Sequence, residues 1–144
     1  VTGDVLHSRV ARSNIWGLTK MGAEVVVNGP ATMMPVAIED MGARVEPNIK
    51  HAVKDADVIM GLRIQLERQK NGLFPTIREY SKFFSVNEEV LSYAAKDCLI
   101  MHPGPVNRGV EMTSMLIDGD LSVIEEQVTS GVAVRMAILY ILTR

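Results

Sequence analysis

The chain has 144 residues, of which 47% are hydrophobic and 22% are charged, and its formal net charge is −2. This length and composition are typical of one globular domain with a single core. The small negative charge argues against a nucleic-acid-binding function, because such proteins usually carry a clear basic excess on one face. No apolar run reaches the roughly 18 to 20 residues that a membrane-spanning helix requires. We therefore expect a domain that binds neither nucleic acid nor membrane.

The ends and the cysteine content bear on where the protein works. The lone cysteine, Cys98, lies in an apolar run and can form no disulfide within the chain, which favours a buried thiol in a reducing, cytoplasmic setting. The N-terminus lacks the basic and then apolar segments of a secretory signal. The chain opens at Val1 and enters a strand-like stretch almost at once, which is typical of a piece of a longer polypeptide, although a processed terminus gives the same opening.

The first half of the chain alternates short apolar runs with helical patterns. After a clipped strand that ends near Val5, Ser8 is the predicted N-cap of a helix in which apolar residues recur every three or four positions until Gly22. Strands are predicted at 23–27, 43–46 and 57–62, and short helices at 35–41 and 49–56. The strand at 57–62 is almost wholly apolar, so we expect it to be central in a sheet.

The second half begins with a long polar stretch, residues 63–82, which holds one predicted helical piece near 76–83. A loop of that length in a compact domain is usually functional. A helix is predicted at about 88–95, a strand at 98–101, and a helical tail from about Ser122, with a possible break at Gly131. The alternation predicts a doubly wound α/β domain: a mainly parallel, five-stranded, Rossmann-like sheet with helices on both faces and a long C-terminal helix.

Three polar segments, at 7–12, 63–68 and 102–108, each follow a predicted strand. The carboxyl ends of parallel strands lie along one edge of a sheet, so these segments can meet in one crevice. Arg9 and Arg12 fall in the first turn of a helix, where the helix dipole disfavours a cation but backbone N–H groups favour a bound anion. The sequence therefore predicts an anion site, with pairing of both arginines to an acidic neighbour such as Asp4 as the alternative.

The other two segments fit the same site, although each has a plainer explanation. Polar and apolar residues alternate from 63 to 67, which places Arg63, Gln65 and Glu67 on one face of an extended segment, where Glu67 can orient Arg63. A solvated strand end would show the same alternation. Two prolines stiffen the turn at 102–105 and leave carbonyl oxygens free to accept hydrogen bonds, as would a rigid turn that merely ends a strand.

Other chemistries find no support in the sequence. It contains neither a glycine-rich nucleotide-binding motif after a strand nor a G-x-S-x-G nucleophile elbow. The three histidines, His7, His51 and His102, have no cysteine or carboxylate at metal-ligand spacing. We therefore expect neither a phosphate-cradling nucleotide site nor a metal site.

Taken together, the three segments resemble the signature blocks of bacterial aspartate carbamoyltransferase. They read GDVLHSRVARSN from Gly3, LRIQLER from Leu62 and MHPGPVNRGVE from Met101, and they cover the C-terminal, aspartate-binding half of that family's catalytic chain. The resemblance implies that the two carboxylates of L-aspartate are held by Arg9, Arg63 and Gln65. It implies that the carbamoyl group is contacted by backbone carbonyls of Pro103 and Gly104. The residues implied to support them are His7, Arg12, Glu67, Arg68 and His102.

The same resemblance carries expectations for the whole enzyme. It implies that residues 1–144 form the aspartate-binding domain and that the carbamoyl phosphate domain is absent from this sequence, so that the isolated chain is inactive. The full enzyme would be a cytoplasmic homotrimer of pyrimidine biosynthesis, without cofactor, that binds L-aspartate and carbamoyl phosphate. Its candidate partners are a regulatory chain or a dihydroorotase.

Two alternatives remain open at this point. One is a carbamoyltransferase for another amino acid, such as ornithine, although Arg63 and Gln65 are poor partners for a cationic side chain. The other is a non-catalytic anion-binding or assembly domain of the same fold.

Overall fold

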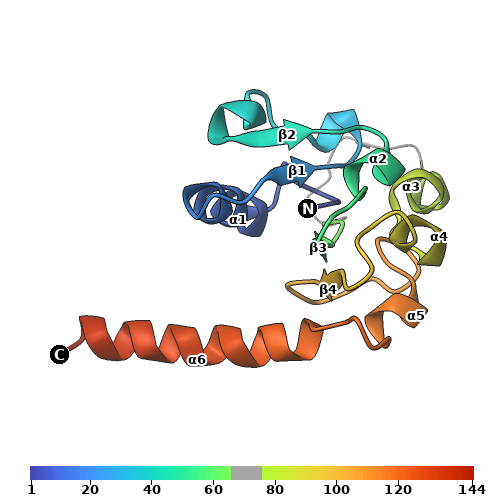
Figure 1. Ribbon diagram of the computed structural model, residues 1–144. Coiled ribbons are helices and arrows are strands. Elements are labelled where there is room, and N and C mark those ends of the chain that lie inside the picture. The colour runs from blue at the N-terminus through green and yellow to red at the C-terminus, as the bar shows by residue number, and fades with distance from the viewer. Residues whose placement is uncertain (66–75) are drawn as a thin grey trace.

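The computed structural model describes residues 1–65 and 76–144. Its strands form two parallel pairs (Figure 1). In one pair β1 (Val25–Val27) lies beside β2 (Ala43–Val45), and in the other β3 (Val58–Met60) lies beside β4 (Leu99–Met101). These positions confirm the four predicted strands at 23–27, 43–46, 57–62 and 98–101, each with shorter bounds.

The single five-stranded sheet predicted from the sequence is not confirmed. Over the residues described, the first predicted strand is reduced to Thr2, which forms isolated parallel bridges to Asn28 after β1 and to Gly61 after β3. Thr2 N donates to Met60 O at 2.9 Å, and Leu62 N donates to Thr2 O at 2.8 Å. Thr2 therefore lies between the two strand pairs and holds their carboxyl ends on the same side of the domain.

Among the described residues, three helices have eight or more residues: α1 (Arg9–Lys20), α3 (Ile77–Phe84) and α6 (Ile124–Leu142). Single-turn helices are α2 (Ile49–Ala52), α4 (Glu88–Leu91) and α5 (Ser114–Ile117), and the 3₁₀ turns are η1 (Ala31–Met33) and η2 (Ile38–Met41). Side-chain caps explain where most of the helices begin, because each cap satisfies backbone N–H groups that lack a partner within the helix. The capping side chains belong to Ser8, Asn48, Thr76 and Asn87.

Several helical predictions need correction. The helix predicted at 35–41 is a 3₁₀ turn over its second half only, and the one predicted at 49–56 ends at Ala52, before Asp55 takes a left-handed backbone conformation with φ 56°. The helix predicted at 88–95 ends at Leu91. No break occurs at Gly131, which lies inside the continuous helix α6.

Two main apolar clusters form the core. One packs α1 against the first strand pair and contains Val5, Ala11, Ile15, Val25, Val27, Ile38, Ala43 and Leu62. The other packs the second strand pair against the short helices and contains Ile49, Val53, Ile59, Val86, Val90, Cys98, Ile100, Met112 and Leu116. Cys98 is fully buried, as predicted.

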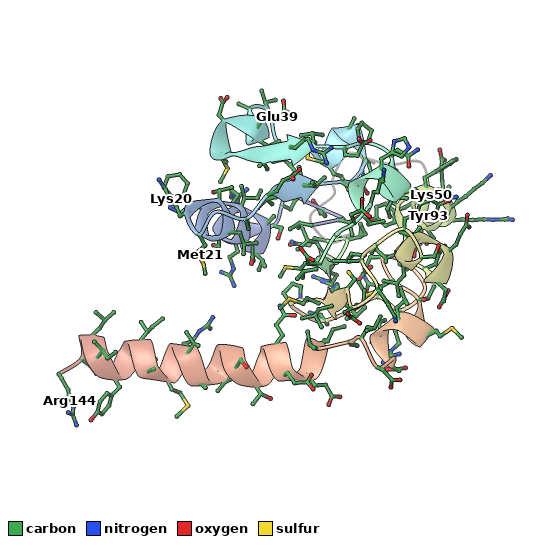
Figure 2. All side chains as sticks on the ribbon, in the orientation of Figure 1. Lys20, Met21, Glu39, Lys50, Tyr93 and Arg144 are labelled. Carbon is green, nitrogen blue, oxygen red and sulfur yellow. The ribbon has the colours of Figure 1, made fainter. Side chains whose placement is uncertain are left out.

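Helix α6 stands apart from this core. It runs along one side of the domain in Figure 1 and has no buried residue. Figure 2 shows its side chains extending into open space as far as Arg144. Large apolar side chains such as Ile138 and Leu142 are 50% and 75% exposed. Among the described helices, none combines the length and hydropathy needed to cross a bilayer.

Candidate functional site

An open cavity of about 1160 Å³ lies between the core of the domain and α6. The predicted site residues in its lining come from all three polar segments: His7, Arg9, Arg12, Arg63, Gln65, Pro103 and Gly104. Helix α6 contributes the facing side, including Gln127 and Arg135. The structure thus brings the three polar segments together at one cavity, as the strand-end argument predicts.

The cavity has a strongly cationic lining. Within the described lining, four residues are arginines (Arg9, Arg12, Arg63 and Arg135) and none is aspartate or glutamate. Over residues 1–65 and 76–144, no ion pair joins Arg9 or Arg12 to a carboxylate, and Arg12 Nη1 donates instead to Leu6 O at 3.1 Å. The alternative pairing with Asp4 is therefore not observed. The guanidinium groups of Arg9 and Arg12, which pair with no carboxylate of the described residues, favour an anionic ligand.

The N-terminus of α1 adds to this field. Ser8 has an extended conformation, and its Oγ accepts a hydrogen bond from Ala11 N at 3.1 Å. The first turn of the helix has no acidic residue. Ser8, Arg9 and Val10 all line the cavity, so the positive end of the helix dipole lies at its wall.

A buried carboxylate joins the first two polar segments. Asp4 is fully buried, and its Oδ1 and Oδ2 lie 2.9 and 3.1 Å from His7 Nδ1. Asp4 also accepts hydrogen bonds from His7 N at 3.1 Å and from Gln65 N at 3.5 Å. In return, Gln65 Nε2 donates to His7 O at 3.3 Å. These contacts fix Gln65 against the segment that leads into α1.

A second buried pair shapes the third segment. His102 is fully buried and does not line the cavity, but its Nδ1 accepts a hydrogen bond from Gly104 N at 2.9 Å. The ring hydrogen is therefore on Nε2, which lies 3.4 Å from Glu111 Oε1. Glu111 Oε1 also accepts from Asn107 N at 2.6 Å, and Gln127 Oε1 accepts from His102 N at 2.9 Å. His102 thus connects the turn, Glu111 and the start of α6.

Tyr80 of α3 is affected by both buried carboxylates. Burial is the main cause that raises the pKa of Tyr80, and the negative charges of Glu111 and Asp4 raise it further. The phenol is therefore neutral at physiological pH. Its ring lies 5.6 Å, centroid to centroid, from that of Phe84 in a small third cluster.

Sequence reasoning missed the contribution of α6 and the burial of Glu111. Gln127 follows two glutamates near the start of α6, and Arg135 is an isolated polar position in its apolar part; only the tertiary placement of that helix brings them to the cavity. Two predicted supporting residues, Glu67 and Arg68, lie outside the described residues. In the part of the chain that the structure describes, no group of three or more His, Cys, Asp or Glu side chains could hold a metal ion.

Comparison with known proteins supplies the family. The family described as "Aspartate/ornithine carbamoyltransferase, Asp/Orn binding domain" matches residues 1–142. The protein named aspartate carbamoyltransferase catalytic subunit of Ruminiclostridium cellulolyticum is 66% identical over 144 residues, and the one of Acetivibrio thermocellus is 62% identical over 144 residues. Each alignment covers 100% of this chain and 46% of the relative, so the chain spans about half the length of these curated relatives.

Solved structures agree with this match. The ornithine carbamoyltransferase of Pyrococcus furiosus superposes with a TM-score of 0.66 at 31% identity, over 82% of this chain and 41% of that one. The ornithine carbamoyltransferase of Burkholderia thailandensis reaches a TM-score of 0.78 at 22% identity, over 96% of this chain and 44% of that one, and shows the shared α/β fold. The chain therefore belongs to the aspartate/ornithine carbamoyltransferase family and corresponds to its Asp/Orn-binding domain.

Proposed function

We propose that this chain is the aspartate-binding half of an enzyme that transfers the carbamoyl group of carbamoyl phosphate to L-aspartate, giving N-carbamoyl-L-aspartate and phosphate. The observation that carries the proposal is the meeting of Arg9, Arg63 and Gln65 with Pro103 and Gly104 in one cationic cavity. The relatives named aspartate carbamoyltransferase, at 62–66% identity, support aspartate as the amino acid.

The chemistry of the lining suits a small dicarboxylate. Arg9 and Arg63 can each bind one carboxylate through two N–H groups, and such charge-assisted bonds contribute about 1.5 to 3 kcal/mol. Gln65 uses one amide hydrogen on His7 O, which leaves the second for a substrate carboxylate. The carbonyl oxygens of Pro103 and Gly104 are suited to accept hydrogen bonds from the NH₂ of a carbamoyl group.

Catalysis would follow from holding both substrates in reacting geometry. The aspartate amine attacks the carbamoyl carbon, a tetrahedral intermediate forms, and phosphate leaves. His102 acts indirectly, because its bond to Gly104 N fixes the turn that carries the two carbonyl groups. No step of this reaction needs a cofactor.

The proposal extends to the architecture of the whole enzyme. Residues 1–144 would form one domain, in which Thr2 occupies the place of a central fifth strand of a Rossmann-like sheet. A carbamoyl phosphate domain outside these residues would complete the site and cover the apolar sides of α6. The full enzyme would be a cytoplasmic homotrimer of pyrimidine biosynthesis, with a regulatory chain or dihydroorotase as candidate partners.

Ornithine is a poorer fit to the cavity than aspartate. Its side chain carries an ammonium group, and no acidic residue is found in the described lining to receive it. The two solved ornithine carbamoyltransferases compared above share this fold, but their sequences are only 31% and 22% identical to this chain. The relative named aspartate carbamoyltransferase is 66% identical.

The test is an assay of the full-length catalytic chain with carbamoyl phosphate and either L-aspartate or L-ornithine, with the ureido product identified by mass spectrometry. We expect carbamoyl aspartate to form at enzymatic rates and no turnover of ornithine. The 144-residue chain alone should form neither product. Faster turnover of ornithine than of aspartate would contradict the proposal, and turnover of neither would favour a binding domain.

A further inference from the structure

The ring of His7 is held at Nδ1 by a buried carboxylate, and the side chain is partly exposed. Its side chain is 24% exposed, whereas that of Asp4 beneath it is fully buried. His7 Nδ1 lies 2.9 and 3.1 Å from the two oxygens of Asp4. A carboxylate can only accept a hydrogen bond, so Nδ1 carries the hydrogen and Nε2 of the neutral ring has a lone pair.

The other ring nitrogen of His7 has no partner among the described residues. His7 is part of the lining, and no residue within 1–65 or 76–144 makes a hydrogen bond to its Nε2. The ring contacts Asp4, and four arginines share the cavity with it: Arg9 and Arg12 from α1, Arg63 from the segment after β3, and Arg135 from α6. A ring nitrogen that can accept a proton therefore belongs to a residue of the same cavity as the guanidinium groups assigned to the substrate.

We propose that His7 Nε2 accepts the proton that the amino group of the substrate loses before it attacks the carbamoyl carbon. This inference rests on the proposed function. The α-ammonium group has no lone pair, so one proton must leave before the N–C bond can form. Asp4 keeps the ring in the required tautomer and stabilises the imidazolium that results, as a buried carboxylate does for a catalytic histidine.

The remaining steps balance without a further reactant. As the N–C bond forms, the π electrons of the carbamoyl carbonyl move to its oxygen. When they return, the C–O bond to phosphate breaks and phosphate leaves with that electron pair. The attacking nitrogen loses its second proton to the departing phosphate, and His7 later releases the first proton to water.

A purely structural role for His7 makes a different prediction, and one substitution separates the two. In His7→Asn the side-chain amide nitrogen takes the place of Nδ1 and can still donate to Asp4, but no base remains at the position of Nε2. The backbone contacts of residue 7 with Asp4 and Gln65 are retained. A structural clamp would therefore survive this change, whereas a proton acceptor would not.

The experiment uses the full-length catalytic chain at saturating carbamoyl phosphate, with kcat/KM for aspartate measured between pH 5.5 and 9. We expect His7→Asn to lower kcat/KM by about 10²- to 10⁴-fold, the usual contribution of a general base. The acidic limb of the wild-type pH profile should disappear, while the dissociation constant of an unreactive aspartate analogue such as succinate changes less than about threefold. His51→Asn, on the exposed side of α2, is the matched control and should leave both the rate and the profile unchanged.

Three results would overturn the inference. The first is a folded His7→Asn enzyme with kcat/KM within about threefold of wild type and its acidic limb intact. The second is the same outcome for a folded His7→Gln enzyme, which is the variant to test if His7→Asn does not fold. The third needs no variant: a wild-type profile without an acidic ionisation between pH 5.5 and 8. If the wild-type enzyme synthesises carbamoyl aspartate, the proposed function stands whichever of these three results is obtained. If the wild-type enzyme makes no carbamoyl aspartate, the proposed function itself is refuted.

Discussion

Glu111 is predicted to be a main determinant of stability in the turn that carries Pro103 and Gly104. Its side chain is only 1% exposed. Its Oε1 accepts a hydrogen bond from Asn107 N at 2.6 Å and lies 3.4 Å from His102 Nε2. The substitution Glu111→Ala removes the acceptor of the Asn107 N–H and the carboxylate that lies nearest to the fully buried imidazole of His102.

The size of the effect follows from these contacts. An unsatisfied buried donor costs about 1 to 3 kcal/mol. Asn107 is half-buried and its N–H can recover part of this loss from water, whereas the fully buried imidazole of His102 loses the attraction of the carboxylate 3.4 Å away. The expected loss is about 1 to 3 kcal/mol, a sizeable part of the roughly 5 to 15 kcal/mol by which a domain is stable. With a urea slope of about 2 kcal/mol per molar, the unfolding midpoint should fall by about 0.5 to 1.5 M.

The assay is urea unfolding of the 144-residue chain, followed by circular dichroism at low protein concentration. Asp118→Ala is the matched control, because Asp118 also holds this turn through Arg108, at 2.6 and 2.8 Å, but with side chains 62% and 50% exposed. The Arg108 guanidinium lowers the pKa of Asp118, yet solvent screens so exposed a pair and its loss should shift the midpoint far less. Equal midpoints for the two variants would refute the reasoning.

Three further predictions concern the site, the core and α6. In the full-length enzyme, Arg63→Ala should raise the aspartate requirement about ten- to hundredfold through loss of a charge-assisted bond, with carbamoyl phosphate affinity little changed; an equal loss for both substrates in steady-state kinetics would contradict the assignment. Burial raises the pKa of the Cys98 thiol, so the native chain should react with Ellman's reagent only as it unfolds, and rapid labelling without denaturant would contradict this. The exposed apolar side chains of α6 should cause the isolated chain to self-associate in sedimentation, and truncation after Gly131 should reduce this; a monomer that truncation leaves unchanged would contradict it.

Local chemistry explains which parts of the fold the sequence predicts. Ser8 and Asn48 cap helices where predicted, because a capping side chain acts within three residues of its position. Gly42 ends η2 with φ 91°, a conformation that glycine adopts without strain. The meeting of the three polar segments is also predictable, because parallel strands bring their carboxyl ends to one edge.

The features that sequence reasoning missed depend on tertiary structure. Helix α5 is a single turn held by burial of Leu116, which no periodicity reveals. The buried states of Asp4 and Glu111 cannot be told from solvated carboxylates by residue type, and Asp4 pairs with His7 rather than with an arginine. The position of Arg135 in the cavity depends on where α6 lies relative to a core that it barely contacts.

The central claim is that this cavity is the aspartate half of a carbamoyl-transfer site. Its most direct test is a crystal structure of the full-length catalytic chain with a stable analogue in which L-aspartate is joined to a phosphonate through an amide. We predict that the two carboxylates lie at about 2.7 to 2.9 Å from the guanidinium groups of Arg9 and Arg63, with the amide next to the carbonyl groups of Pro103 and Gly104. An analogue whose aspartate end contacts neither arginine would contradict the account.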